Sequence, residues 1–358
     1  MLPNLRVEEE LVGTKSAVAG MTSPIAQDVL AARPSVRAFL GRFSGQFGET
    51  LAPSVILRRC DIPDSYKTYD ALAGLRDILS ACSVPLARAC YLAYGAERSP
   101  GELHFSDVFD IYPWMPGGTR EYLHLRNYQM NAVHVVSQFH GQGTPGVRPG
   151  QLMDSHFEKR LAETLLERWD DHFGATRPDR ADTSLFRALN MAREAARMPS
   201  GQTVYDVGRN IALWVSAYEI LAHMGKRSSL NAVLALLEHV SWQDSNLRED
   251  QTIICGTAPA RIPTWLCRKI YALRNDFLHG NDVSSGMLSH NGRGMLDYAA
   301  CLFRFVLAGF LKEAPAGPIG DVFTEGSSTY WLERTGDLAA KQWWNLERGL
   351  LTLHKVHP

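Results

Sequence analysis

The sequence predicts a mainly α-helical protein, α+β overall, with a mixed N-terminal region ahead of a helical C-terminal domain. Apolar residues recur at helical spacing in residues 152–173 and again through residues 184–312. Alternating β-branched and aromatic runs, which are typical of strands, are confined to residues 101–147. Between the two helical stretches, residues 174–182 combine Gly, Pro and charged residues, as linkers do.

This linker sets the expected domain boundary. We expect residues 1–175 to form a mixed region of helices and a few strands, and residues 176–358 to form a helical domain. The composition fits two such domains, because 45% of the 358 residues are apolar and 21% are charged. The 37 Lys and Arg residues nearly balance the 38 Asp and Glu residues. A net charge of −1 argues against non-specific coating of nucleic acid, but a small local basic site is still compatible with it.

The six cysteines indicate neither a metal centre nor a disulfide framework. They form no CxxC pair, and none has a histidine at the spacing of zinc ligands. We therefore expect no metal and no other cofactor, and thiols that stay reduced. The N-terminus lacks a cationic start followed by an apolar block, and the most apolar run, residues 299–311, is short and contains Arg304. These features predict a cytoplasmic protein without a membrane span.

Within the N-terminal region, residues 1–35 are expected to be irregular, and residues 65–94 to be helical with a break near Pro85. Strands are expected at Phe105–Tyr112 and Ala132–Phe139, since Pro and Gly surround both runs.

The stretch from Leu152 to Phe173 predicts one amphipathic helix. Ser155 and Glu158 have the spacing of a capping box, and Gly174 suits a C-terminal stop. Its apolar stripe consists of Phe157, Leu161, Leu165, Trp169 and Phe173.

The C-terminal domain is expected to be almost wholly helical. Asp206 is a candidate N-cap, and Gly225 and Gly280 are candidate helix stops. Residues 330–353 predict a final helix with packed tryptophans. The other helices are expected near residues 184–197, 206–224, 229–240, 262–279 and 293–312.

The helix at residues 262–279 has an unusual polar face. Its apolar stripe is Leu266, Ile270, Leu273 and Phe277, and the residues expected on the opposite side are Arg268, Tyr271, Asn275 and His279. Asn275 and His279 are four residues apart and can touch, while the long Arg274 side chain can swing toward this face. Because a surface helix usually carries Lys and Glu there, this face is a candidate functional site.

The residues from Arg274 to His279 match the R-N-x-x-x-H signature, and the segment resembles HEPN domains. Ala212–His223 looks like the second helix of such a domain and Ile270–Gly280 like the third. The arrangement is similar to the ApeA-like HEPN branch of bacterial anti-phage proteins, in which the HEPN domain follows a region partly built of strands. The resemblance covers about residues 180–312 and implies an antiparallel helical bundle.

The resemblance implies a metal-independent endoribonuclease that works as a homodimer, with two such helices facing each other across a cleft. Cutting RNA without metal needs a base, an acid and a cation for the charge on phosphorus. His279 would be the acid or base, Arg274 the cation, and Asn275 would orient His279 or the phosphate. Glu219, from the second helix, would hold Arg274 or the imidazole, and Tyr271 would support the same face.

The expected partners are an RNA substrate, a second copy of the chain and a phage-derived trigger. One chain offers a single histidine on this helix, so a symmetric dimer would supply the second. Since a constantly active ribonuclease would harm its host, we expect residues 1–175 to sense the trigger or restrain the site.

Other interpretations of the same residues are open. The HEPN-like domain could be a non-catalytic module that binds RNA or protein. Glu219 could pair with Arg187, Arg209 or His223 instead of Arg274. The arginines 193, 197, 268 and 274 could form a basic patch or be scattered over the surface. We interpret the histidines 104, 124, 134, 140 and 156 as ordinary polar residues, because no further ligand converges on them. A nucleotidyltransferase pattern is not present.

Overall fold

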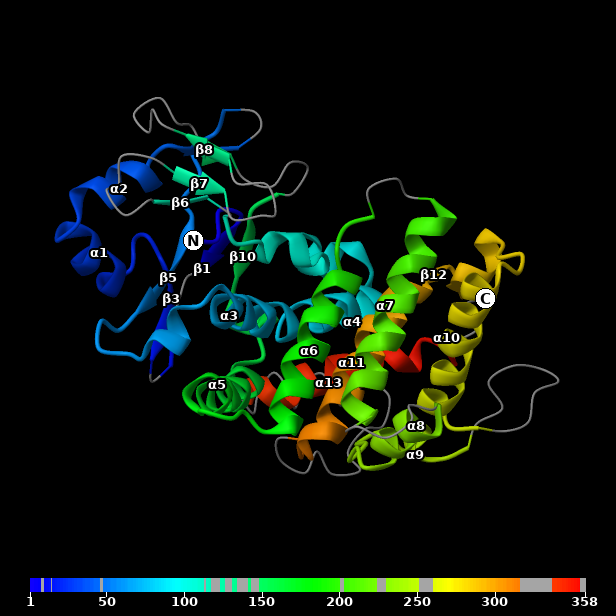
Figure 1. Cartoon of the computed structure of the whole chain (residues 1–358). Coiled ribbons are helices and arrows are strands. Elements are labelled where there is room, and N and C mark those ends of the chain that lie inside the picture. Colours follow the sequence, from blue (N-terminus) through cyan, green and yellow to red (C-terminus); the bar gives the residue numbers. More distant parts are fainter. Residues whose placement is uncertain are drawn as a thin grey trace. The chain divides into compact units, whose positions relative to one another are not determined.

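The computed structural model describes two compact units, one of residues 1–63 with 107–153 and one of residues 64–106 with 154–358 (Figure 1). The described residues are 1–7, 10–13, 15–45, 48–112, 114–116, 123–125, 131–133, 141–142, 148–199, 203–223, 230–250, 260–315 and 337–354. The expected mainly helical class is confirmed, with short strands added to it.

The first unit consists of short strands and two helices. Its antiparallel sheet has the order β2-β3-β5, β6-β7-β8 form a second one, and β1-β10 and β4-β9 are parallel pairs. The strands are β1 (Leu5–Val7), β2 (Leu11–Val12), β3 (Ser16–Gly20), β4 (Phe43–Ser44), β5 (Ser54–Arg58), β6 (Trp114–Pro116), β7 (Leu123–Leu125), β8 (Asn131–Val133), β9 (Gly141–Gln142) and β10 (Gly150–Leu152). The helices are α1 (Pro24–Ala31) and α2 (Pro34–Leu40).

The irregular structure expected for residues 1–35 is wrong, because β1, β2, β3 and α1 lie there. The pattern of residues in β3 did not predict a strand, and the reason is physical. All five of its residues are buried, so the strand shows no alternation of polar and apolar side chains. Ala19 of β3 and Val55 of β5 join Ala26 and Leu30 of α1 in the core of this unit.

The strand expected at Phe105–Tyr112 is also wrong, since residues Ser106–Phe109 form the 3₁₀ turn η4. The amide of Ser106 donates to the carbonyl of Ala196, which fixes the start of this turn within the helical unit. Of the second expected strand, β8 covers the beginning, and residues 134–139 lie outside the described part.

The second unit is helical. Its helices are α3 (Tyr69–Ala81), α4 (Val84–Tyr94), α5 (Lys159–Gly174), α6 (Arg180–Ala195), α7 (Val204–His223), α8 (Leu230–Glu238), α9 (Ser245–Arg248), α10 (Ile262–His279), α11 (Met295–Leu311) and α13 (Leu338–Leu351). Short 3₁₀ turns and one hairpin connect them: η1 (Asp64–Lys67), η2 (Ala96–Arg98), η3 (Gly101–His104), η6 (Asp154–His156), η7 (Ser285–Leu288), β11 (Ser289–His290) and β12 (Arg293–Gly294).

Helix α11 is the centre of this unit. From Tyr298 to Gly309 all of its side chains are buried, and it contacts α4, α7, α8, α10 and α13. A helix that is apolar on every side needs such a cover, so the neighbours surround it. No helix in the described part of the chain has both the length and the apolar character needed to cross a membrane.

The helical unit begins earlier in the chain than the expected boundary at residue 175. Helix α4 contacts α11 and α13, and α3 contacts α5 and α6, so these helices share one core with the C-terminal ones. The polar segment after Gly174 is a turn of five residues between α5 and α6. The polar, Gly- and Pro-containing composition indicates that this segment is exposed to solvent. A tight turn between packed helices is exposed in the same way as a linker between domains, so composition alone does not distinguish the two.

Helix α5 confirms the expected apolar stripe but not the expected cap. Leu161, Leu165 and Trp169 are buried as expected, whereas the helix begins at Lys159 and not near Ser155. Glu158 therefore precedes the helix, and its carboxylate has another partner.

That partner is Arg304, a guanidinium on α11 that is 1% exposed. Its Nε lies 2.9 Å from both carboxylate oxygens of Glu158, and its Nη2 donates to Glu313 Oε1 at 2.9 Å. The guanidinium also lies 5.5 Å from the centre of the Trp343 ring on α13. Although burial opposes the charge, the two glutamates hold the pKa of Arg304 above its usual value. The Arg304 side chain thus connects the start of α5, the end of α11 and α13.

We expect Arg304→Met to destabilise the helical unit by about 3–5 kcal/mol, because it leaves buried carboxylates without a cation. Denaturation with urea, followed by circular dichroism, measures the loss. Arg59→Met is the control, since Arg59 forms an exposed pair with Asp61 and its removal should change little. Equal stability of Arg304→Met and the wild type would contradict this role.

A second buried carboxylate, Glu347 on α13, caps the segment before α9. It is 0% exposed and accepts hydrogen bonds from the amides of Gln243 and Asp244 and from the indole of Trp343. Burial raises its pKa from the ordinary 4.5 to about 7, although these bonds oppose the shift.

The folded state therefore binds this proton more tightly than the unfolded state. The stabilisation is fully present below pH 4.5 and is lost as the pH rises to about 7. We expect the free energy of unfolding of the wild type to fall by on the order of 3 kcal/mol more than that of Glu347→Gln over this range. Urea titrations at several pH values test this, and parallel pH profiles of the two proteins would refute it.

Candidate functional site

The candidate site lies on the last turns of α10, which has the bounds predicted from the sequence. Gly280 follows it with φ 72° and ψ 23°, a left-handed conformation that favours glycine, and so confirms the expected stop. Leu266, Ile270 and Leu273 are buried and Phe277 is half-buried, which confirms the apolar stripe.

The polar residues of the motif lie on the outer side of these turns. Asn275 and His279 are exposed and Arg274 is half-buried. Nη1 of Arg274 donates to Oδ1 of Asn275 at 3.1 Å, so these two side chains are brought together. Within the described part of the chain, His279 has no hydrogen bond or ion pair, and so none with Asn275. The imidazole is therefore open to solvent.

Tyr271 was expected on the exposed polar face, and this is wrong. It is only 7% exposed, and its hydroxyl lies beside Glu219 of α7. Burial, followed by the charge of Glu219, raises the pKa of Tyr271 above its usual value, and Arg274 opposes this shift. At about 100° per residue, Tyr271 lies only ~40° from Cys267 around the helix, and Cys267 is fully buried. Helix α10 thus buries a wider arc than its apolar stripe, because α7 covers this flank.

Glu219 is half-buried on α7 and lies close to Tyr271, which in turn is near Arg274. The structure therefore places Glu219 on the side of α7 that faces α10. The alternative partner Arg209 pairs with Asp206 one turn earlier, at 3.6 Å.

Asp206 itself is not the N-cap that the sequence suggested. It lies in the first turn of α7, where it and Thr203 exchange hydrogen bonds in a capping-box pattern.

Helices α7 and α10 run in opposite directions. Gly208, near the start of α7, meets Phe277, near the end of α10, while Glu219 lies beside the earlier residue Tyr271. A Cβ atom at Gly208 would lie 2.0 Å from the Phe277 ring, so only glycine permits this approach. The same close contact holds the last turn of α10, and with it the motif, against α7.

The arginines considered for a basic patch do not form one. Arg268 is exposed on α10, whereas Arg193 is buried on α6, where its guanidinium contacts Glu194 and lies 3.8 Å from Asp77. Arg197 lies on the far side of Glu194, at 3.9 Å. Arg193 and Arg197 thus belong to a different polar cluster from the motif.

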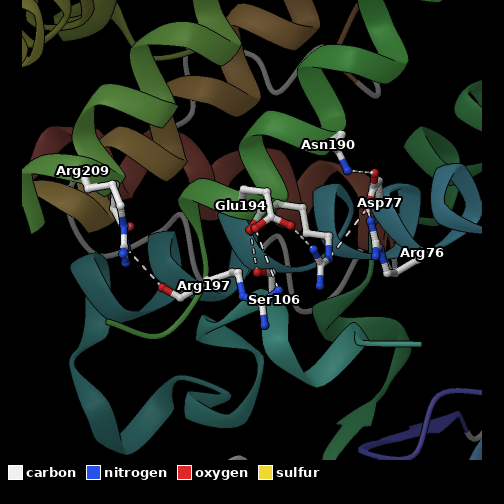
Figure 2. Close-up of polar contacts among 9 residues, drawn as sticks. Arg76, Asp77, Ser106, Asn190, Glu194, Arg197 and Arg209 are labelled. Carbon is white, nitrogen blue, oxygen red and sulfur yellow. Dashed lines mark hydrogen bonds and ion pairs between the residues drawn. The ribbon is translucent and has the colours of Figure 1, made fainter. Parts of the chain in front are cut away.

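That cluster was not foreseen from the sequence (Figure 2). Asp77 of α3 is 2% exposed, accepts a bond from Arg76 Nε at 2.8 Å and one from Asn190 Nδ2 at 3.0 Å, and faces Arg193. Burial raises the pKa of Asp77, and the two arginines oppose the shift. Burial, followed by Arg76, lowers the pKa of Arg193 to about 10. These groups satisfy one another between α3 and α6, so we assign them to packing.

The histidines of the chain do not converge on a metal. Among the described residues, no group of three or more His, Cys, Asp or Glu side chains could hold an ion. His104 bonds to Ser99, and burial lowers its pKa to about 4, which fits a neutral structural histidine. The side chains of His124, His134 and His140 lie outside the described part.

No protein-family model, curated protein or solved structure matches the chain. The likeness to HEPN domains is therefore carried by the motif and its surroundings alone.

For Gly208 we predict that substitution by alanine lowers the stability of the protein, which is the opposite of the usual effect inside a helix. Replacing glycine by alanine inside a helix ordinarily stabilises it by about 1 kcal/mol. Here Gly208→Ala should lower the melting temperature, because the new methyl group collides with Phe277. Gly208→Ala combined with Phe277→Leu should recover part of the loss. The control is Gly101→Ala, where no atom lies within 4 Å of the new methyl group. A higher melting temperature for Gly208→Ala would rule out the close contact.

Proposed function

We propose that the chain is a metal-independent endoribonuclease whose C-terminal helices form a HEPN-type antiparallel bundle. The observation that carries the proposal is the outer face of α10, where exposed His279 follows the bonded pair of Arg274 and Asn275. A guanidinium and an unengaged imidazole beside solvent are the groups that cleavage of a phosphodiester requires.

The chemistry assigns one task to each group. A base removes the proton of the ribose 2′-hydroxyl, whose oxygen attacks phosphorus, and an acid protonates the departing 5′-oxygen. Arg274, with its fixed fork of N–H donors, stabilises the charge that develops on the phosphoryl oxygens. His279 acts as the acid or the base, and Asn275 orients Arg274. The products carry a 2′,3′-cyclic phosphate and a 5′-hydroxyl.

One imidazole cannot act as acid and base in the same step. We therefore propose that two copies of the chain form a symmetric dimer, so that each contributes one His279 to a shared cleft. Glu219 supports the site indirectly, through Tyr271 and the neighbouring Arg274. It holds the arginine side of the motif in place while His279 stays free to exchange protons.

We further propose that the enzyme is a cytoplasmic effector of anti-phage defence. The cysteines at positions 82, 90, 267 and 301 are buried, which fits thiols that serve as small core residues. A ribonuclease that acts on the host's own RNA needs restraint until infection. The unit of residues 1–63 and 107–153 is separate from the helices that carry the motif, so it is the candidate sensor of a phage-derived trigger.

We expect wild-type protein to cleave RNA in EDTA, alone or with extract from phage-infected cells, and His279→Ala or Arg274→Ala to lower the rate by about 100-fold or more. Gel analysis and detection of cyclic phosphate ends measure the activity. His239→Ala, in the turn after α8, and Arg160→Ala, on α5, are matched controls, because both replace exposed side chains outside the motif and should leave the rate unchanged. The proposal fails if the wild type never cuts RNA, or if all four variants cut equally well.

A non-catalytic module for RNA or protein binding is the second candidate, and one observation favours it. Leu278, next to His279, is 58% exposed, and an apolar side chain of this size suits an interface. This alternative requires His279→Ala to weaken assembly, whereas the catalytic proposal expects the dimer to survive. Size-exclusion chromatography with light scattering distinguishes the two.

A further inference from the structure

A pocket lies within the helical unit, apart from the polar face of α10. Its volume is about 380 Å³, at the small end of the ~300–1,000 Å³ range of ligand pockets. Helices α4, α7 and α11 and the turn η7 line it, and most of the lining is apolar. Phe105, Met198, Leu288 and Met295 supply flat or flexible apolar surfaces that suit a planar ligand.

Two opposite charges interrupt this apolar lining. The Arg88 side chain is 3% exposed, lies 5.4 Å from the centre of the Phe105 ring, and donates from Nε to the carbonyl of His104. Its Nη1 lies 3.6 Å from Asp297 Oδ1, which is an ion pair but too long for a hydrogen bond. Burial lowers the pKa of Arg88, and the charge of Asp297 opposes the shift.

Both groups keep unused hydrogen-bonding capacity. Apart from the bond to His104, the guanidinium donates to no other group in the described part of the chain, and the Asp297 carboxylate accepts no hydrogen bond there. Gly294 has no side chain and leaves space beside the carboxylate, since a Cβ atom there would lie 3.2 Å from Asp297 Oδ2. Because both residues line the pocket, their remaining donors and acceptors are available to a ligand that enters it.

The charge of the pair restricts the ligand. A simple anion would meet Asp297, and a simple cation would meet Arg88, so the pocket suits a neutral group. That group must present acceptors to the guanidinium and, next to them, donors to the carboxylate. Guanine does so twice over, with O6 and N7 as acceptors and the N1–H and 2-amino groups as donors. Each hydrogen-bonding edge of adenine presents one acceptor beside one donor, so adenine cannot form both of these paired contacts.

We propose that this pocket binds a guanine base, with Arg88 donating to O6 and N7 and Asp297 accepting from N1–H and the 2-amino group. The base lies among the side chains of Phe105, Leu288 and Met295. It belongs either to a free nucleotide or to single-stranded RNA. This proposal goes beyond the ribonuclease activity and does not depend on it.

The experiment is calorimetric titration of the full chain in EDTA with GMP, AMP, and the RNA pentamers UUGUU and UUAUU. His279→Ala protein is used for the RNA so that no pentamer is cut. We expect the guanine ligand to bind at least about tenfold more tightly than its adenine counterpart, as a bidentate contact discriminates between bases. Binding of GMP identifies a free nucleotide as ligand, and binding of UUGUU alone identifies a base within RNA. No binding, or equal binding of guanine and adenine ligands, overturns the proposal.

Two variants locate the ligand. Asp297→Asn should weaken guanine binding by about tenfold or more, because the new amide replaces one acceptor oxygen with a donor. Leu288→Trp should abolish binding by filling the pocket, without touching Arg88 or Asp297. Asp61→Asn, which alters an exposed ion pair in the other unit, is the control. Unchanged affinity in a folded Leu288→Trp protein would overturn the assignment to this pocket.

Discussion

The buried Arg304 guanidinium is the constraint on which the helical unit depends. Its charge lies inside α11, whose side chains are all buried from Tyr298 to Gly309, so it is almost entirely shielded from water. A charge in that position is tolerable only with carboxylates at hydrogen-bonding distance, which Glu158 and Glu313 provide. These partners come from the start of α5 and from just beyond α11. The pairing therefore fixes where α5 begins, and it links helices that are about 150 residues apart in the sequence.

Around this central helix, the remaining helices form a rigid frame for the outer residues. Helix α7 packs on α11 with one side and on α10 with another. The contact of Gly208 with Phe277 brings α7 and α10 unusually close, and Tyr271 fills the space near Glu219. The last turns of α10 are thereby held from within, while Asn275 and His279 stay outside. A site built on a supported helix end combines fixed backbone geometry with side chains that a ligand can reach.

The same helix α7 separates two features of different chemistry. On one side is the exposed motif, whose guanidinium and imidazole would act on a charged phosphodiester in the proposed reaction. On the other side, Val207 borders the pocket of Arg88 and Asp297, which is neutral overall and largely apolar. The two features differ in their exposure to solvent. Exposed side chains can exchange protons with water, whereas side chains that line a pocket recognise the shape and the hydrogen-bond pattern of a ligand. This difference is the reason why we propose a phosphodiester as the ligand of the first feature and a base as the ligand of the second.

The amino-acid pattern was enough to predict the positions of the long helices and the left-handed stop at Gly280, because periodicity and caps are local properties of the chain. It also singled out Arg274, Asn275 and His279 as the polar end of α10. Three features became visible only in the folded chain: Tyr271 is buried, Glu158 pairs with Arg304, and α3 and α4 pack with the C-terminal helices. Each of these depends on which distant helix covers a given flank. The spacing of apolar residues every three to four positions does not predict which helix will pack there. It indicates only which face of one helix is buried, and it contains no information on the neighbouring helices.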